Sequence, residues 1–262
     1  MNHPDLLSPT LLHAAAFVVV ASGAMMIAAH TAILSFATRR TSVSRRAQIG
    51  VPLLTAGLLA GWFAWSVLAV GDWVTAPEPP PLPGGVVQRP DLLLDMAAAV
   101  VLGIVVMFIS RAAKEINAAT PPAWLIGVQS YRIAGVMFLW PFLASGALPA
   151  GFALPAGIGD MLTGIAAPFV ALAVAQSRPG ARARAVAWNW FGILDLVVAT
   201  IAAVLTHTTN VGRFPLVVVP LFLGPPLGIL THIWSLRNLR AARMAEAAPV
   251  SRELPRETVA IA

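Results

Sequence analysis

Long apolar segments recur along almost the whole chain and constrain its fold more than any other feature. A membrane-spanning helix needs about 20 predominantly apolar residues, because the bilayer core is ~30 Å thick and an α-helix rises about 1.5 Å per residue. The sequence therefore predicts an all-α, polytopic integral membrane protein, a single bundle of seven transmembrane helices over residues 1–243, followed by a mobile cytoplasmic tail over 244–262. The predicted spans are residues 11–38, 47–70, 92–110, 124–148, 154–175, 185–206 and 215–236.

The composition agrees with a location in the membrane. Hydrophobic residues make up 58% of the 262 residues and charged residues only 11%, and the mean hydropathy is +0.80. A soluble domain carries roughly a quarter charged residues, so this chain is too apolar to be one. It contains no cysteine, which excludes disulfides, thiol nucleophiles and thiolate metal sites.

The positions of the basic residues predict the orientation of the bundle. Alternate loops and the start of the tail hold Arg39, Arg40, Arg45, Arg46, Arg111, Lys114, Arg178, Arg182, Arg184, Arg237, Arg240 and Arg243. The opposite loops hold only Arg89 and Arg213. Because basic residues gather on the cytoplasmic side, we expect an external N-terminus and a cytoplasmic C-terminus in the cell inner membrane. The net charge of +6 then follows from the topology, so the expected partner is the lipid bilayer and not nucleic acid.

Polar residues inside the predicted helices are the candidate site residues. Each ionisable group at the centre of a bilayer costs about 2.5–3.5 kcal/mol on insertion scales, so these side chains are expected to face the interior of the bundle, between the fourth and seventh helices. We expect the following residues to bind a substrate or ion or to carry a proton: Asp160, Asp195, Arg132, His232, His30, Asn189 and Gln129. No residue is assigned to catalysis or to metal binding.

Helical rise converts sequence position into depth in the membrane. Arg132, Asp195 and His30 fall about 12–13 Å from the cytoplasmic ends of their predicted helices, so the sequence predicts an ion pair between Arg132 and Asp195. Asp160 falls about 9 Å below the external end of its helix, roughly 8 Å in depth from Arg132. We therefore expect Asp160 to lack a basic partner and to be protonated for part of a working cycle. The alternatives are an Arg132–Asp195 pair that only fixes helix packing and an Asp160 satisfied by water or by Thr163.

These residues favour a protein that binds or transports a small solute or ion, in a process linked to protons. One alternative is a membrane-embedded enzyme or redox protein that uses His30 and His232, with a single haem b between them. Another is an accessory or assembly subunit whose polar residues serve packing. A retinal protein is excluded, because its chemistry needs a lysine within the membrane and the only lysine, Lys114, lies in a predicted loop.

Overall fold

The computed structural model describes residues 9–70, 90–109, 111–145, 148–206 and 224–247. Within these ranges all regular structure is helical, so the all-α fold class is confirmed. The elements are α1 (Pro9–Thr38), α2 (Arg45–Val70), α3 (Pro90–Ile109), α4 (Arg111–Ala119), α5 (Pro122–Val128), the 3₁₀ helix η2 (Gln129–Gly135), α6 (Val136–Ser145), α7 (Ala150–Ala175), α8 (Ala181–Leu205) and α9 (Pro225–Ala247).

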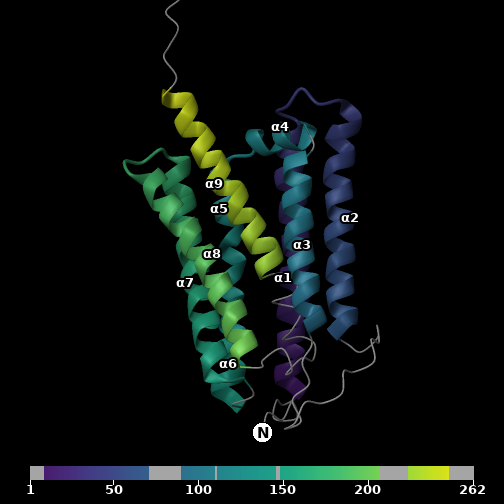
Figure 1. Ribbon diagram of the computed structural model, residues 1–262, viewed down its shortest axis with the longest axis vertical. Helices are drawn as coiled ribbons and strands as arrows, with labels where there is room; N and C mark the ends of the chain where they lie inside the picture. The colour runs from purple at the N-terminus through teal and green to yellow at the C-terminus, as the bar shows by residue number, and fades with distance from the viewer. Residues whose placement is uncertain (1–8, 71–89, 110, 146–147, 207–223, 248–262) are drawn as a thin grey trace, which may run out of the picture.

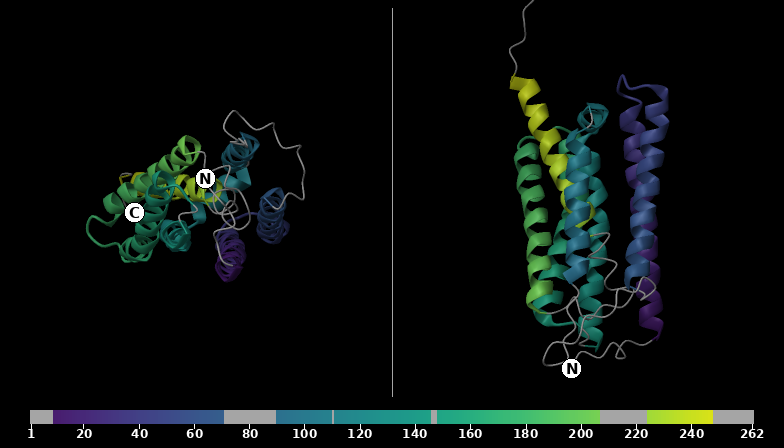
Figure 2. Two further views of the ribbon diagram at one scale, coloured as in Figure 1. Left: turned by 90° about the horizontal axis from the view of Figure 1, so that it is seen from below. Right: turned by 45° about the vertical axis from the view of Figure 1, so that its right-hand side comes forward.

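The long helices run side by side along the length of the molecule, and the short α4 lies across one end (Figure 1). Seen from below, α1 and α2 lie on one side of the bundle, and α7 and α8 lie on the other (Figure 2). Helix α7 packs against α8, α5, η2 and α6, whereas α9 packs against α8, α5 and α3. The half of the bundle that contains α5 to α9 therefore has an interior enclosed by several elements.

Among the described residues, four helices are long and apolar enough to cross a membrane. They are His13–Thr38, Arg45–Leu68, Ala150–Ala175 and Ala181–Leu205, and α3 contains a shorter apolar stretch, Leu94–Val105. Large apolar side chains cover the outside of these helices, which is the surface that lipid requires and that water disfavours. This is the architecture of a multi-pass membrane protein in contact with lipid.

The predicted span 124–148 is not one continuous α-helix, which corrects the sequence expectation. It comprises α5, η2 and α6, and the seven-residue 3₁₀ segment lies in its middle. Ser130 Oγ donates to the carbonyl of Gly127 at 2.8 Å, so a side chain competes for a backbone acceptor where the α-helix ends. Gly135 ends the 3₁₀ segment, and glycine has a low helix propensity. The interruption lengthens this element, because a 3₁₀ helix rises about 2.0 Å per residue.

Helix α4 is fixed across the end of the bundle by side chains of α9. Trp234 Nε1 donates to the carbonyl of Asn117 at 3.1 Å. Asn238 Nδ2 donates to the carbonyls of Asn117 and Thr120, each at 2.6 Å. These bonds satisfy carbonyls at the C-terminal end of α4 that have no partner within the helix. Helix α9 extends to Ala247, so the predicted tail begins inside it, and residues 248–262 lie outside the described part of the chain.

Candidate functional site

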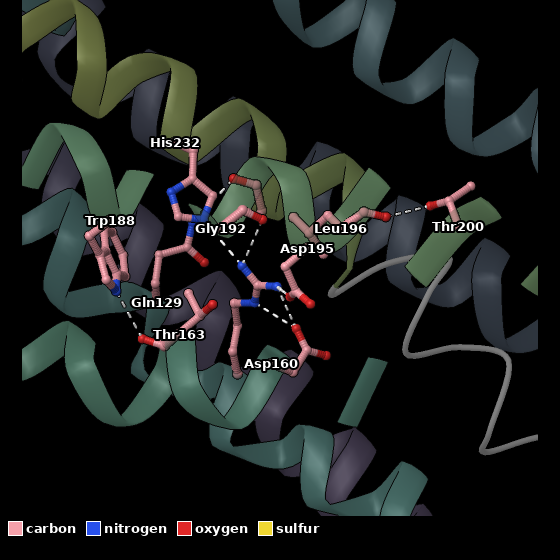
Figure 3. Close-up of polar contacts among 11 residues, drawn as sticks. Gln129, Asp160, Thr163, Trp188, Gly192, Asp195, Leu196, Thr200 and His232 are labelled. Atoms are coloured by element: carbon pink, nitrogen blue, oxygen red, sulfur yellow. Dashed lines mark hydrogen bonds and ion pairs between the residues drawn. The ribbon is translucent and has the colours of Figure 1, made fainter. Parts of the chain in front are cut away.

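Arg132 lies in the middle of the 3₁₀ segment, with its side chain only 1% exposed, and its guanidinium contacts two carboxylates. Nε donates to Asp160 Oδ1 at 2.6 Å, and Nη2 lies 2.6 Å from the same oxygen. Nη2 also donates to Asp195 Oδ2. Because Asp160 belongs to α7 and Asp195 to α8, one cation joins three separate elements in the interior of the bundle (Figure 3).

The remaining guanidinium nitrogen determines the tautomer of a histidine on α9. Arg132 Nη1 donates to the carbonyl of Gly192 at 3.2 Å and lies 3.2 Å from His232 Nε2. An arginine has no acceptor, so His232 Nε2 must be the acceptor in this contact and carries no proton. The proton of the neutral ring is then on Nδ1, which donates to Asn189 Oδ1 at 2.9 Å. His232 is therefore the neutral Nδ1–H tautomer in this arrangement.

The polar chain continues from Asn189 toward the end of the bundle where α4 lies. Asn189 Nδ2 donates to the carbonyl of Ala185 at 2.8 Å and to Ser235 Oγ at 3.1 Å. Asn189, His232 and Ser235 are all buried. A continuous hydrogen-bonded chain thus connects Ser235 to Arg132 through two helices, α8 and α9.

Glycines allow the charged side chains to fit between the helices. A Cβ atom at Gly159 of α7 would overlap the Asp195 carboxylate, and one at Gly192 of α8 would overlap the His232 ring. A Cβ atom at Gly135 of η2 would overlap the side chain of Asp160. Each of these glycines therefore provides the space in which one member of the cluster packs, and larger residues would force the elements apart.

The cluster contains more negative than positive charge. Arg132 supplies one positive charge, His232 is neutral, and Asp160 and Asp195 supply two negative charges when both are ionised. Within the described residues, neither carboxylate has a second cationic partner. An uncompensated charge is costly in a low-dielectric interior, and one guanidinium does not balance two ionised carboxylates.

The structure confirms the predicted contact between Arg132 and Asp195 and corrects the prediction for Asp160. Asp160 has a basic partner, since it is bonded to Arg132. The alternative in which Thr163 satisfies Asp160 is not observed, because Thr163 Oγ1 is buried and has no hydrogen-bond partner within the described residues. The prediction placed Asp160 too far from Arg132 because it assumed a continuous helix and a later start for α7.

His30 lies apart from this cluster. Its Nδ1 is 2.9 Å from the carbonyl of Met26, and its Nε2 is 3.3 Å from Thr231 Oγ1. Both ring nitrogens of His30, like both of His232, are thus within hydrogen-bonding distance of protein atoms. Axial ligation uses one nitrogen of each ring and would break the contact made by that nitrogen, so the two histidines as they are bonded here do not fit a haem between them. The described residues also contain no group of three or more His, Asp or Glu side chains that could hold a metal ion.

Gln129 is the remaining predicted site residue, and it lies one 3₁₀ turn from Arg132. Its Nε2 donates to the carbonyl of Gly228 on α9 at 3.1 Å, whereas its Oε1 is buried and has no hydrogen-bond partner in the described part of the chain. Sequence reasoning missed the contributions of Gly135 and Gly159 and of the Gly192 carbonyl. The available signal was spacing: Gly159 immediately precedes Asp160, and Gly192 lies one turn before Asp195.

The fold and site define a multi-pass helical membrane protein with a buried polar cluster in one half of its bundle. The chain belongs to the family described as a domain of unknown function, DUF8737, whose family model matches residues 90–240. The match extends from the start of α3 into α9 and includes every residue of the charged cluster, whereas α1 and α2 precede it. No curated protein and no solved structure matches the chain.

Proposed function

We propose that this protein crosses the inner membrane seven times and moves a small solute or ion through the α5–α9 half of its bundle, in exchange for or together with a proton. The site is the cluster of Arg132, Asp160 and Asp195, with His232, Asn189 and Gln129 beside it. The single observation that carries the proposal is the pairing of one guanidinium with two carboxylates.

The seven-span topology rests on three elements beyond the four candidate spans. Helix α3, the α5–η2–α6 unit and α9 lie alongside those spans in the bundle (Figures 1 and 2). The α5–η2–α6 unit runs from Pro122 to Ser145, a rise of about 40 Å, which exceeds a bilayer core of ~30 Å. The distribution of basic residues supports the external N-terminus and the cytoplasmic C-terminus.

The excess negative charge gives the link to protons a physical basis. A buried charge without a partner is expensive at membrane depth, so one of the two carboxylates binds a proton whenever no other cation is present. Protonation of either carboxylate leaves a one-to-one ion pair with Arg132. The carboxylates belong to different helices, so the arrival and departure of the proton change the attraction between η2, α7 and α8.

The interrupted helix supports transport over a purely structural role. Transporters commonly place their substrate and ion sites at discontinuous helices near the middle of the membrane, where helix ends offer unpaired backbone groups. Here the 3₁₀ segment lies at the centre of the α5–η2–α6 unit and carries both Gln129 and Arg132. On α9, Pro225 and Pro226 begin the helix directly after Gly224.

A screen followed by an uptake assay tests this function. The purified protein would be screened by thermal shift at two pH values against small amines, carboxylates, sugars and inorganic ions. Stabilising compounds would then be tested for uptake into proteoliposomes with and without a pH gradient. We expect uptake of at least one class to respond to the gradient in the wild type and not in Asp160→Asn. Identical responses in the two proteins would leave the cluster with a packing role, as in an accessory subunit.

A further inference from the structure

The side-chain carbonyl oxygen of Gln129 lies in the interior and has no hydrogen-bond partner among the residues that the structure describes. The residue is fully buried, and its Nε2 donates to the carbonyl of Gly228 at 3.1 Å. This bond fixes the orientation of the amide, because a flipped amide would place Oε1 against another carbonyl oxygen. Oε1 therefore points away from Gly228, and it makes no hydrogen bond to any described residue. A buried acceptor left unsatisfied is costly, which indicates that a further group binds there.

Thr163 has a second buried side-chain oxygen without a hydrogen-bond partner among the described residues. Five other threonines, each within a helix or directly after its last residue, donate to the carbonyl four residues earlier, the usual way in which a helix satisfies a buried hydroxyl: Thr31, Thr120, Thr200, Thr206 and Thr231. Thr163 is fully buried, yet its Oγ1 makes neither this bond nor any other within the described structure. Its hydroxyl is therefore free to bind a group supplied from outside the chain.

The two oxygens belong to elements in direct contact beside the charged cluster. A Cβ atom at Gly164 of α7 would meet the backbone of Arg132 and Ile133, so α7 touches η2 next to Thr163. Gln129 and Thr163 each lie three positions from a member of the ion pair, Arg132 and Asp160 respectively. Figure 3 shows the two side chains in the same part of the cluster, between Trp188 and Asp160.

We propose that Gln129 Oε1, Thr163 Oγ1 and the Asp160 carboxylate bind one small monovalent cation. An amide carbonyl, a hydroxyl and a carboxylate are the oxygen ligands that hard cations prefer, and they also accept hydrogen bonds from ammonium. The net charge of the cluster determines the charge of the cation that it binds, because the cluster carries one excess negative charge when both carboxylates are ionised. A monovalent cation neutralises it, whereas a divalent cation would leave a positive charge in the membrane interior.

This cation competes with the proton of the proposed function, on which the inference rests. With one of them bound, the cluster is neutral; with both bound, it carries an excess positive charge. Binding of the cation therefore releases a proton from the carboxylates. The same cluster accepts either occupant but not both, which is the condition for exchanging one for the other across a membrane.

The test measures proton release and thermal stabilisation of the purified full chain in weakly buffered detergent. Lithium, sodium, potassium and ammonium chloride are each compared with choline chloride at constant ionic strength. We expect at least one of these cations to raise the melting temperature above the choline control and to release protons. The comparison among the four salts distinguishes an alkali metal ion from ammonium.

Matched threonine variants localise the effect. Thr163→Val removes the free hydroxyl and keeps the shape, and we expect it to weaken the apparent cation affinity at least about tenfold. Thr200→Val removes a hydroxyl that is satisfied within α8, and it should bind the cation as the wild type does. Thr163→Ser keeps the hydroxyl and should also bind normally, which provides a test if the valine variant does not fold.

Three outcomes would overturn the inference. They are no cation effect beyond choline, an equal effect of Thr163→Val and Thr200→Val, or a loss of cation affinity in Thr163→Ser as large as that in Thr163→Val. If the carboxylates still exchange a proton in any of these cases, the proposed function stands without the cation site. If Asp160→Asn leaves proton exchange unchanged as well, both proposals fail.

Discussion

Asp160 accepts a hydrogen bond from Arg132 Nε at 2.6 Å, although the two residues are 28 positions apart and lie on elements that enter the bundle from opposite ends. Asp195 binds the same guanidinium through a different nitrogen. The two carboxylates therefore share one positive charge, and any change to one member alters the charge balance of the other two.

Removal of the guanidinium should be the most damaging single change in the cluster. Arg132→Gln leaves two carboxylates without a cation, and we expect it to lower the free energy of unfolding by about 3–5 kcal/mol. Arg132→Lys keeps the charge but cannot reach both carboxylates and the Gly192 carbonyl with one ammonium group, so it should fall between the wild type and the glutamine variant. Denaturant unfolding in detergent would measure this order. Equal stability of the Gln and Lys variants would show that charge is unimportant here.

Neutralisation of one carboxylate should be tolerated. Asp160→Asn or Asp195→Asn leaves a one-to-one ion pair with Arg132, so each variant should fold and reach nearly normal abundance. The double variant leaves the guanidinium unpaired, and its loss of stability should exceed the sum of the single effects by about 0.5–3 kcal/mol. A double-mutant cycle of unfolding free energies measures this coupling. Strictly additive effects would mean that the carboxylates do not share the cation.

The sequence predicted the helical class, the buried polar residues and the Arg132–Asp195 contact. These features follow from the apolar length of each segment and from the cost of burying a charge, and both can be read from the sequence of a single segment. It failed for Asp160, because depth depends on helix type and on where each helix begins. With the 3₁₀ rise included, Arg132 lies about 17 Å from the start of α5. Asp160 lies about 15 Å from the start of α7, which begins at Ala150 and not at Leu154. The two depths are measured from opposite ends of the bundle, and their sum is about the thickness of a bilayer core, ~30 Å. The two residues therefore lie at the same level.

The tautomer of His232 illustrates a second limit of sequence analysis. It follows from Arg132 on one side of the ring and Asn189 on the other, and these residues come from η2 and α8. A stripe of polar residues on α9 shows which face is buried but not which side chains of other elements oppose it.

The close approach of Gly159 to Asp195 gives a prediction with an internal control. Gly159→Ala places a methyl group where the Asp195 carboxylate lies, and we expect a loss of about 1–3 kcal/mol from overpacking. Gly57→Ala on α2 is the control, because a Cβ atom there meets no atom of the described residues within 4 Å. Since alanine favours helix more than glycine does, this variant should be as stable as the wild type or more so. Thermal unfolding compares them, and equal losses at both sites would contradict the packing argument.

The orientation can be tested with single cysteines, since the chain contains none. Pro80→Cys and Thr208→Cys, at positions outside the described residues, should react with a membrane-impermeant thiol reagent added to intact cells. Ser42→Cys and Ala183→Cys, which are exposed next to the basic loops, should react only after the membrane is opened. Labelling of Ser42→Cys from outside would contradict the proposed topology and indicate the opposite orientation.

The shared proton is the central claim, and infrared difference spectroscopy tests it most directly. The wild-type protein, without added alkali or ammonium cations, should show the carbonyl band of a protonated carboxylic acid in the pH range where the protein is folded. The band should shift in D₂O and disappear in both Asp160→Asn and Asp195→Asn, because each variant makes the cluster neutral without a bound proton. A wild-type spectrum identical to those of both variants in this region would show that no proton is held there and would contradict the account.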